Sequence, residues 1–238
     1  MKTNLDRQLD SDSILFRSLS DEQKKSARQR SRSELNILDS LEHQLRILVK
    51  DKAARGECVE AIAMLDRLIA LCPFKAMYYN NRGLMYFRNG RIVEALCDLS
   101  IALEIDPNLD SAYNNRANCH AARGDLARAI ADYDLALDLN PANLRAWINQ
   151  GITFRQLGMY DRALENFDIT LIIGDSLQSR IYLERGRTYH LQGDWNCAVA
   201  DYQIALQLLE NCPDSIRQEL KVRGWLDELL HPLAVSDY

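Results

Sequence analysis

The sequence Tyr79-Asn80-Asn81-Arg82-Gly83 returns 34 residues later as Tyr113-Asn114-Asn115-Arg116-Ala117. Other residue types recur at the same spacing: Gly56, Gly90, Gly124 and Gly158; Ala61, Ala95, Ala129 and Ala163; Pro73, Pro107 and Pro141. The series continues one residue late at Gly193 and Ala198. A fixed period of this length is typical of a stacked array, in which each unit buries its apolar face only against its neighbours.

Composition and charge narrow the class of protein. Of 238 residues, 47% are hydrophobic, which is ample for a core, and the net charge of -5 excludes a bulk attraction to nucleic acid, although a local patch would still matter. No apolar run approaches the roughly 18 residues that a membrane span needs. The N-terminus lacks a signal-peptide core, and Asp6, Asp10 and Asp12 argue against a transit peptide. We therefore expect a soluble cytoplasmic protein, with the plastid stroma as an alternative.

The six cysteines have no paired spacing that would suit zinc or a redox site. We expect them to be small buried or half-buried hydrophobic residues in a reducing compartment. The sequence thus predicts no metal site and no cofactor.

Residues 1–32 lie outside the repeat and are predicted to form a polar N-terminal arm. An apolar island, Ile14-Leu15-Phe16 with Leu19, precedes a basic stretch from Lys24 to Arg32. One interpretation is a solvated, disordered arm or the ragged start of the first helix. The other is a docking peptide that folds back on the array or contacts an acidic partner.

Residues 33–75 read as a degenerate first unit. Ser33 is a plausible cap, and the apolar residues that follow lie on one helical face: Leu35, Leu38, Leu41, Leu45 and Leu48. This helix is expected to run to about Arg55. A second helix follows Gly56 and ends before Pro73, because proline cannot continue a helix.

Four further units are predicted at residues 76–109, 110–143, 144–178 and 179–212, each with two helices joined at a glycine. They resemble the tetratricopeptide repeat family through these residues: Tyr79, Gly83, Tyr86, Ala95, Leu99, Ala102 and Pro107; Tyr113, Ala117, Ala129, Tyr133, Ala136 and Pro141; Trp147, Gly151, Phe154, Ala163 and Phe167; Tyr182, Gly186, Tyr189, Gly193, Ala198, Tyr202 and Ala205. The third unit departs from the pattern at Thr170 and Asp175. The resemblance implies an all-α, right-handed superhelical solenoid, which residues 213–238 would close with a C-terminal capping helix and a tail.

Small residues in the first helices have a packing explanation. Gly83, Ala117 and Gly151 let one backbone approach another helix closely, and the aromatic residues fill the spaces between helices. An aromatic stripe of this kind is therefore predicted to be core rather than a cofactor site.

Motifs that carry catalytic chemistry are absent from the sequence. It has no phosphate-binding glycine loop, no Gly-x-Ser-x-Gly, no His-Glu-x-x-His and no Cys-x-x-Cys. His190 has no convincing nucleophile or metal partner, and Asp132 and Asp134 point to different faces of a helix. We therefore predict that the protein is not an enzyme.

The resemblance also implies where a partner would bind, because in this family the first helix of each unit lines a concave groove. By position, the predicted partner-binding residues are Asn80, Asn114, Asn115, Asn118, Arg145, Asn149, Arg155, Arg180, Arg187 and His190. Asparagine both donates and accepts, which suits holding a peptide main chain. The four arginines are expected to converge at one end of the groove and to favour an acidic segment, against the alternative of a solvated helix face.

A subfamily that grips chaperone C-termini uses a set of lysine, asparagine and arginine residues, and this chain matches it incompletely in either frame. Asn80 replaces the first lysine in one frame, and Glu184 replaces a cation in the other. We therefore do not predict chaperone-tail binding. The main hypothesis is a non-enzymatic adaptor or assembly factor that holds a partner peptide or helix in its groove. The alternative is an RNA-associated helical-repeat protein that uses the basic arm and the groove arginines, although no aromatic residues alternate with them.

Overall fold

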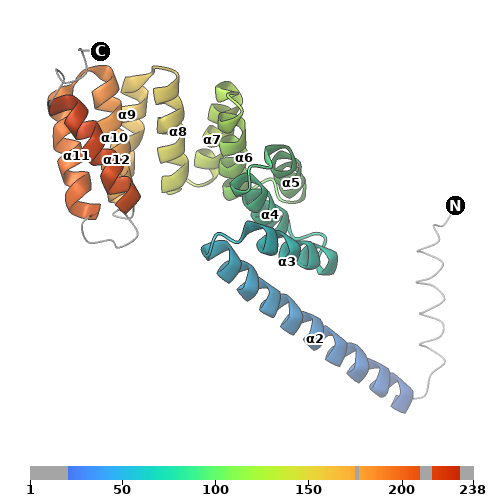
Figure 1. Ribbon diagram of the computed structural model, residues 1–238. Coiled ribbons are helices and arrows are strands. Elements are labelled where there is room, and N and C mark those ends of the chain that lie inside the picture. Colours follow the sequence, from blue (N-terminus) through green and yellow to red (C-terminus); the bar gives the residue numbers. More distant parts are fainter. Residues whose placement is uncertain (1–20, 175–176, 210–215, 231–238) are drawn as a thin grey trace. The chain divides into compact units, whose positions relative to one another are not determined.

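The computed structural model describes residues 21–174, 177–209 and 216–230, which form helices joined by short turns. The helices are α2 (Asp21–Ala54), α3 (Cys58–Leu71), α4 (Ala76–Arg88), α5 (Ile92–Ile105), α6 (Asp110–Ala122), α7 (Leu126–Leu139), α8 (Leu144–Gln156), α9 (Tyr160–Ile173), α10 (Gln178–Gln192), α11 (Trp195–Leu209) and α12 (Ile216–Leu230). The chain divides into two compact units, Met1–Phe74 and Lys75–Tyr238. Figure 1 labels the helices of each.

The first unit is the helix pair α2 and α3. Leu45 and Val49 of α2 are buried together with Leu65 and Leu68 of α3. Helix α2 begins at Asp21 rather than at the predicted cap Ser33, so residues 21–32 are helical.

The apolar face predicted for α2 is only partly buried. Leu38, Leu41 and Leu48 are 47%, 41% and 45% exposed, whereas Leu45 is 4% exposed. The physical reason is that α3 has 14 residues against the 34 of α2 and covers only one side of its C-terminal part. Leu35 lies where side chains are not described.

The second unit stacks helix pairs. Helix α4 packs on α5, α6 on α7, α8 on α9 and α10 on α11, and the second helix of each pair also packs on the first helix of the next. The buried positions repeat along the stack: Ala95, Leu99 and Ala102; Ala129, Tyr133 and Ala136; Ala163 and Phe167; Ala198, Tyr202 and Ala205. This is the predicted arrangement, in which each helix pair buries its apolar side chains against its neighbours.

The turns inside the pairs are built on glycine. At Gly124 the backbone φ is +79°, a left-handed conformation that costs glycine little. The amide of Gly124 donates to the carbonyl of Ala121 at 2.9 Å, and the amide of Asp125 donates to that of His120 at 3.0 Å. These two hydrogen bonds close the end of α6 and fix where α7 starts.

Close helix packing explains the small residues. A Cβ atom built on Gly151 would lie 2.9 Å from the ring of Phe167 and 3.3 Å from the carbonyl oxygen of Ala163. Both belong to α9, so the close approach is within one pair and not to the next unit. Ala117 is likewise completely buried.

A salt bridge inside three of the four pairs α4–α5, α6–α7, α8–α9 and α10–α11 was not predicted from the sequence. Arg116 of α6 donates from Nε and Nη2 to the two carboxylate oxygens of Asp132 on α7, at 2.8 and 2.7 Å. The same bidentate pairs join Arg82 to Asp98 and Arg185 to Asp201. In the helix pair α8–α9, Gln150 and Asn166 occupy these positions, and the Asn166 amide donates to the side-chain oxygen of Gln150 at 2.9 Å. A polar side-chain interaction between the two helices of a pair is therefore a repeated feature of the array.

The last described helix, α12, packs on α11. Val222 is completely buried, and the ring of Trp225 stacks on Tyr202 with centroids 5.8 Å apart. The predicted cap residue Asp214 and the tail after Leu230 lie outside the described residues.

The cysteines follow the prediction only in part. Cys119 is buried, and burial raises the pKa of its thiol to about 12, while Cys58 and Cys72 are half-buried. Cys97 and Cys197 are exposed, so the expectation of burial is wrong for these two. Their positions fall on the outward faces of α5 and α11. Cys212 and Asp175 lie outside the described residues.

Candidate functional site

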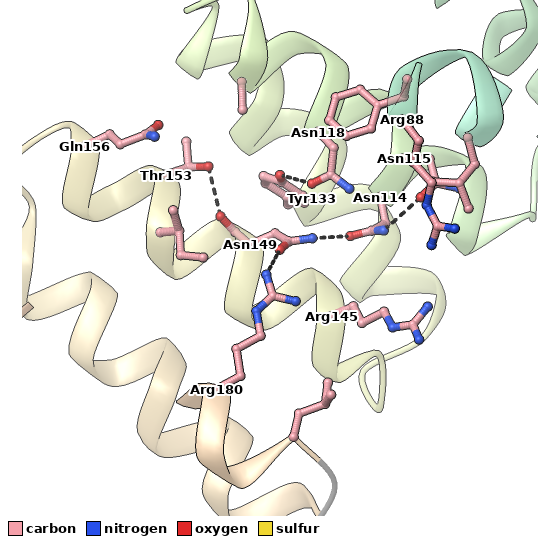
Figure 2. A pocket seen from close by; sticks show the side chains of 15 residues that line it. Arg88, Asn114, Asn115, Asn118, Tyr133, Arg145, Asn149, Thr153, Gln156 and Arg180 are labelled. Carbon is pink, nitrogen blue, oxygen red and sulfur yellow. Dashed lines mark hydrogen bonds between the residues drawn. The ribbon is translucent and has the colours of Figure 1, made fainter. Parts of the chain in front are cut away.

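A groove of about 540 Å³ opens between the first helices of three consecutive pairs and the start of the fourth. Figure 2 shows its lining, which is Leu84, Phe87 and Arg88 of α4; Asn114, Asn115, Asn118 and Ala121 of α6; Tyr133 of α7; Arg145, Asn149, Ile152, Thr153 and Gln156 of α8; and Leu177 and Arg180 at the start of α10. This lining includes three arginines and no aspartate or glutamate. Six of the ten predicted partner-binding residues are thus brought together: Asn114, Asn115, Asn118, Arg145, Asn149 and Arg180.

The asparagines of the groove form a ladder of hydrogen bonds that crosses four pairs. Arg180 donates to the Oδ1 of Asn149 at 2.9 Å, and Asn149 donates to Asn114 at 3.3 Å. Asn114 donates to Asn115 at 3.2 Å, and Asn115 donates to Asn80 at 2.9 Å. Figure 2 shows the central steps of this ladder.

The ladder changes what the groove offers a ligand. Asn149 and Asn114 each accept one hydrogen bond and donate one within the ladder. Because an amide has two acceptor lone pairs and two N–H groups, each of these side chains keeps one of both for a ligand. That these amides hold a peptide main chain by both donating and accepting stays a prediction. Asn80 belongs to the ladder but does not line the groove.

Asn118 is held by the second helix of its own pair. Its Oδ1 accepts from the hydroxyl of Tyr133 at 2.7 Å, which leaves its amide group as a donor at the groove. Burial raises the pKa of Tyr133, so the hydroxyl remains protonated and keeps donating.

Two of the three lining arginines, Arg145 and Arg180, are among the predicted site residues. They occupy the same position in successive first helices and both line the groove. Arg145 is exposed and makes no ion pair or hydrogen bond through its side chain within the described part of the chain. Because neither faces an acidic residue of the lining, a ligand anion would meet their uncompensated positive charge.

Arg155 lies outside the groove lining because it is used between helices. Its Nη2 bonds the carboxylate of Glu184 at 2.7 Å and its Nη1 bonds the backbone carbonyl of the same residue at 2.9 Å. Both side chains are largely buried, with 13% and 16% exposed. Arg155 therefore links α8 to α10, and the carboxylate of Glu184 compensates its charge.

Arg187 and His190 are also placed elsewhere. The guanidinium of Arg187 lies 4.7 Å from the ring centroid of Trp225 on α12 and 3.1 Å from Nδ1 of His190. His190 in turn lies 3.3 Å from the hydroxyl of Tyr202. The predicted convergence of four arginines is thus limited to Arg145 and Arg180, because the other two are engaged at helix contacts.

His190 is expected to make stability depend on pH. Burial, and then the neighbouring charge of Arg187, hold its pKa below the ordinary value, with Glu228 opposing. Below the unfolded-state pKa of about 6.5, His190 binds a proton in the unfolded chain more readily than in the folded chain. The free energy of unfolding is therefore highest above that pH and falls as the pH drops.

We therefore expect His190→Gln to lose less stability than the wild type between about pH 7 and pH 5, measured by denaturant unfolding at each pH. Part of the loss will persist, because burial also lowers the pKa of His120. Identical pH dependence in the two proteins would rule out this role for His190.

Several groove residues were missed among the predicted site residues. Arg88 and Gln156 stand at the same place in the last turns of α4 and α8, one helical turn after Leu84 and Ile152, and that spacing was the available signal. Leu177 was not predictable, because it adopts a left-handed φ of 68° just after the period slips by one residue.

Metal binding finds no support in the described ranges, where no three histidine, cysteine, aspartate or glutamate residues gather as metal ligands would. Nor is any helix in those ranges both long and apolar enough to span a bilayer.

Comparisons with known proteins agree with this geometry. Two tetratricopeptide repeat family models match residues 48–110 and 111–143. A tetratricopeptide repeat protein from Thermus thermophilus is 19% identical, with 78% of this chain and 98% of that chain covered and a TM-score of 0.69. One from Parabacteroides merdae is 22% identical, with 80% and 74% covered and a TM-score of 0.61.

A chain of the APC/C hetero-tetramer Cut9-Hcn1 is 21% identical, with 76% of this chain and 34% of that chain covered and a TM-score of 0.68. These identities speak for the fold alone. No curated protein matches the sequence significantly.

The stacked pairs define a helical-repeat protein with a groove lined by arginine, asparagine and apolar side chains. Residues 48–143 match tetratricopeptide repeat models, which supports the predicted resemblance to this family, and the predicted all-α solenoid is confirmed. Proteins of this family are in general non-catalytic protein-interaction modules.

Proposed function

We propose that this protein is an adaptor or assembly factor that holds an acidic segment of a protein partner, an extended peptide or a helix, in the groove between α4, α6, α8 and α10. The observation that carries the proposal is the chemistry of the lining. Arg145 and Arg180 are cationic, and the lining has no carboxylate. A partner carboxylate therefore finds planar cationic donors and no repulsion.

Apolar residues complete the groove. Leu84 and Phe87 line it from α4, and Ile152 lines it from α8. A segment that carries an apolar side chain beside its acidic groups would bury that side chain against them, which adds affinity without adding charge. We expect no cofactor and no catalysis to be involved.

The experiment is affinity purification with the wild-type chain, followed by measurement of the recovered partner's Kd. Converting Arg145 and Arg180 to glutamate should weaken binding more than tenfold, because the change both removes donors and introduces repulsion. The wild-type association rate should fall with added salt, since exposed charges act mainly on encounter.

The matched control is Arg123→Glu/Arg128→Glu, the same change of charge on exposed arginines that lie outside the groove lining. This control should bind the partner normally, and both double variants should keep the wild-type helicity. Normal binding by the Arg145/Arg180 variant at low salt would place the partner on another surface.

A further inference from the structure

The end of the stack has an uncovered helix. In each complete pair of the second unit, the first helix is packed against its own second helix, as α10 is against α11. Helix α12 packs on α11 in the way that α6 packs on α5, so it takes the position of a next first helix. Within the described residues, no second helix follows to cover its outer side.

The outer side of α12 has a regular pattern. Ile216, Leu220 and Leu230 are 66%, 66% and 55% exposed, and Arg223 and Asp227 between them are also exposed. The five positions are spaced by four, three, four and three residues, which places them on one stripe of the helix. This is the spacing of the seam in a two-stranded coiled coil.

We propose that this stripe is an interface with a second copy of the chain, in which the two α12 helices pack antiparallel about a two-fold axis near Trp225. The pattern is self-complementary in that arrangement. Leu220 meets Leu230 of the partner subunit, and Arg223 meets Asp227 of the partner subunit, and each contact occurs twice. An isologous interface requires such self-complementarity.

Charge selects the direction of the two helices. In a parallel pair in register, each Arg223 would face the partner's Arg223 and each Asp227 the partner's Asp227, so that like charges meet in the seam. In the antiparallel pair both contacts are between opposite charges. Arg223 bonds Glu219 of its own helix through Nε and Nη2, while its Nη1 makes no hydrogen bond within the described part of the chain.

Gly224 favours a close approach of the two helices. It is exposed beside the stripe, and a Cβ built on it would meet nothing within 4 Å. A small residue next to the seam lets a second backbone come near, and Leu220 and Leu230 then bury more surface against their counterparts.

The test is the molar mass of the full chain in solution, measured by sedimentation equilibrium up to about 100 µM protein. We expect the wild type to form a dimer. Arg223→Asp alone and Asp227→Arg alone each place like charges in the seam and should raise the dimer Kd at least tenfold. Mixing these two variants should restore a dimer, because each then supplies the charge that the other lacks.

The double exchange Arg223→Asp/Asp227→Arg should also dimerise, since opposite charges still meet. Arg123→Asp, on an exposed arginine in the α6–α7 turn, is the matched control and should leave the Kd unchanged. Circular dichroism checks that every variant is folded. A wild type that stays monomeric, as it would if its own C-terminal tail covered the stripe, overturns the proposal, and so does a dimer indifferent to the single charge reversals.

Discussion

Alanine in place of Arg116 is expected to lower the free energy of unfolding by about 3–5 kcal/mol. The substitution leaves the Asp132 carboxylate, which is 8% exposed, without the two hydrogen bonds that now satisfy it. A buried charge without a partner costs far more than the net worth of the pair. Denaturant unfolding followed by circular dichroism measures the loss.

The chain supplies its own control for this experiment. In the helix pair α8–α9, Gln150 and Asn166 stand where the other pairs have the arginine and the aspartate. The double variant Arg116→Gln/Asp132→Asn should therefore recover the larger part of the stability. Neutral amides can satisfy each other where a lone carboxylate cannot. A loss below about 1 kcal/mol for Arg116→Ala, or no recovery in the double variant, would show that the pair contributes like a surface salt bridge.

Leucine in place of Gly151 is expected to destabilise the protein by about 1–3 kcal/mol. Even the first added carbon would lie 2.9 Å from the Phe167 ring and 3.3 Å from the backbone carbonyl oxygen of Ala163, which cannot rotate away. The pair α8–α9 must therefore separate, and the neighbouring pairs lose contact with it because the array is coupled through its interfaces.

The control is Ala127→Leu, which introduces the same side chain at an exposed position of α7. That variant should change stability by less than about 0.5 kcal/mol. Equal melting temperatures for Gly151→Leu and the wild type would mean that the close approach of α8 and α9 is not needed for stability.

The fold was readable from the sequence because its determinants repeat. A glycine such as Gly124 recurs with the period at each turn, and a small residue such as Gly151 recurs at each close helix contact. One repeat unit therefore predicts the next. The salt bridge between Arg116 and Asp132 was not predicted, although both residues recur with the period, because a single repeat unit does not reveal which polar residues face each other. The available signal that they face each other is that Gln150 and Asn166 replace both residues in the same repeat unit.

The site was less predictable, because it depends on which side chains bond one another. Position on the first helix placed Asn114 and Asn149 in the groove, yet only the structure shows that Asn149 donates a hydrogen bond to Asn114. Arg145 and Arg155 both lie on α8. Arg155 bonds Glu184 and so has a structural role, whereas Arg145 has no such neighbour and is free for a ligand.

The central claim is that the partner's acidic group sits between Arg145 and Arg180. Arginine Nε–H signals in a nuclear magnetic resonance spectrum, assigned by substitution, test it directly during titration with the partner segment. The Arg145 and Arg180 signals should shift with the binding curve, while those of Arg82 and Arg116, held by Asp98 and Asp132, should not. Saturable binding that leaves the Arg145 and Arg180 signals in place would contradict the claim.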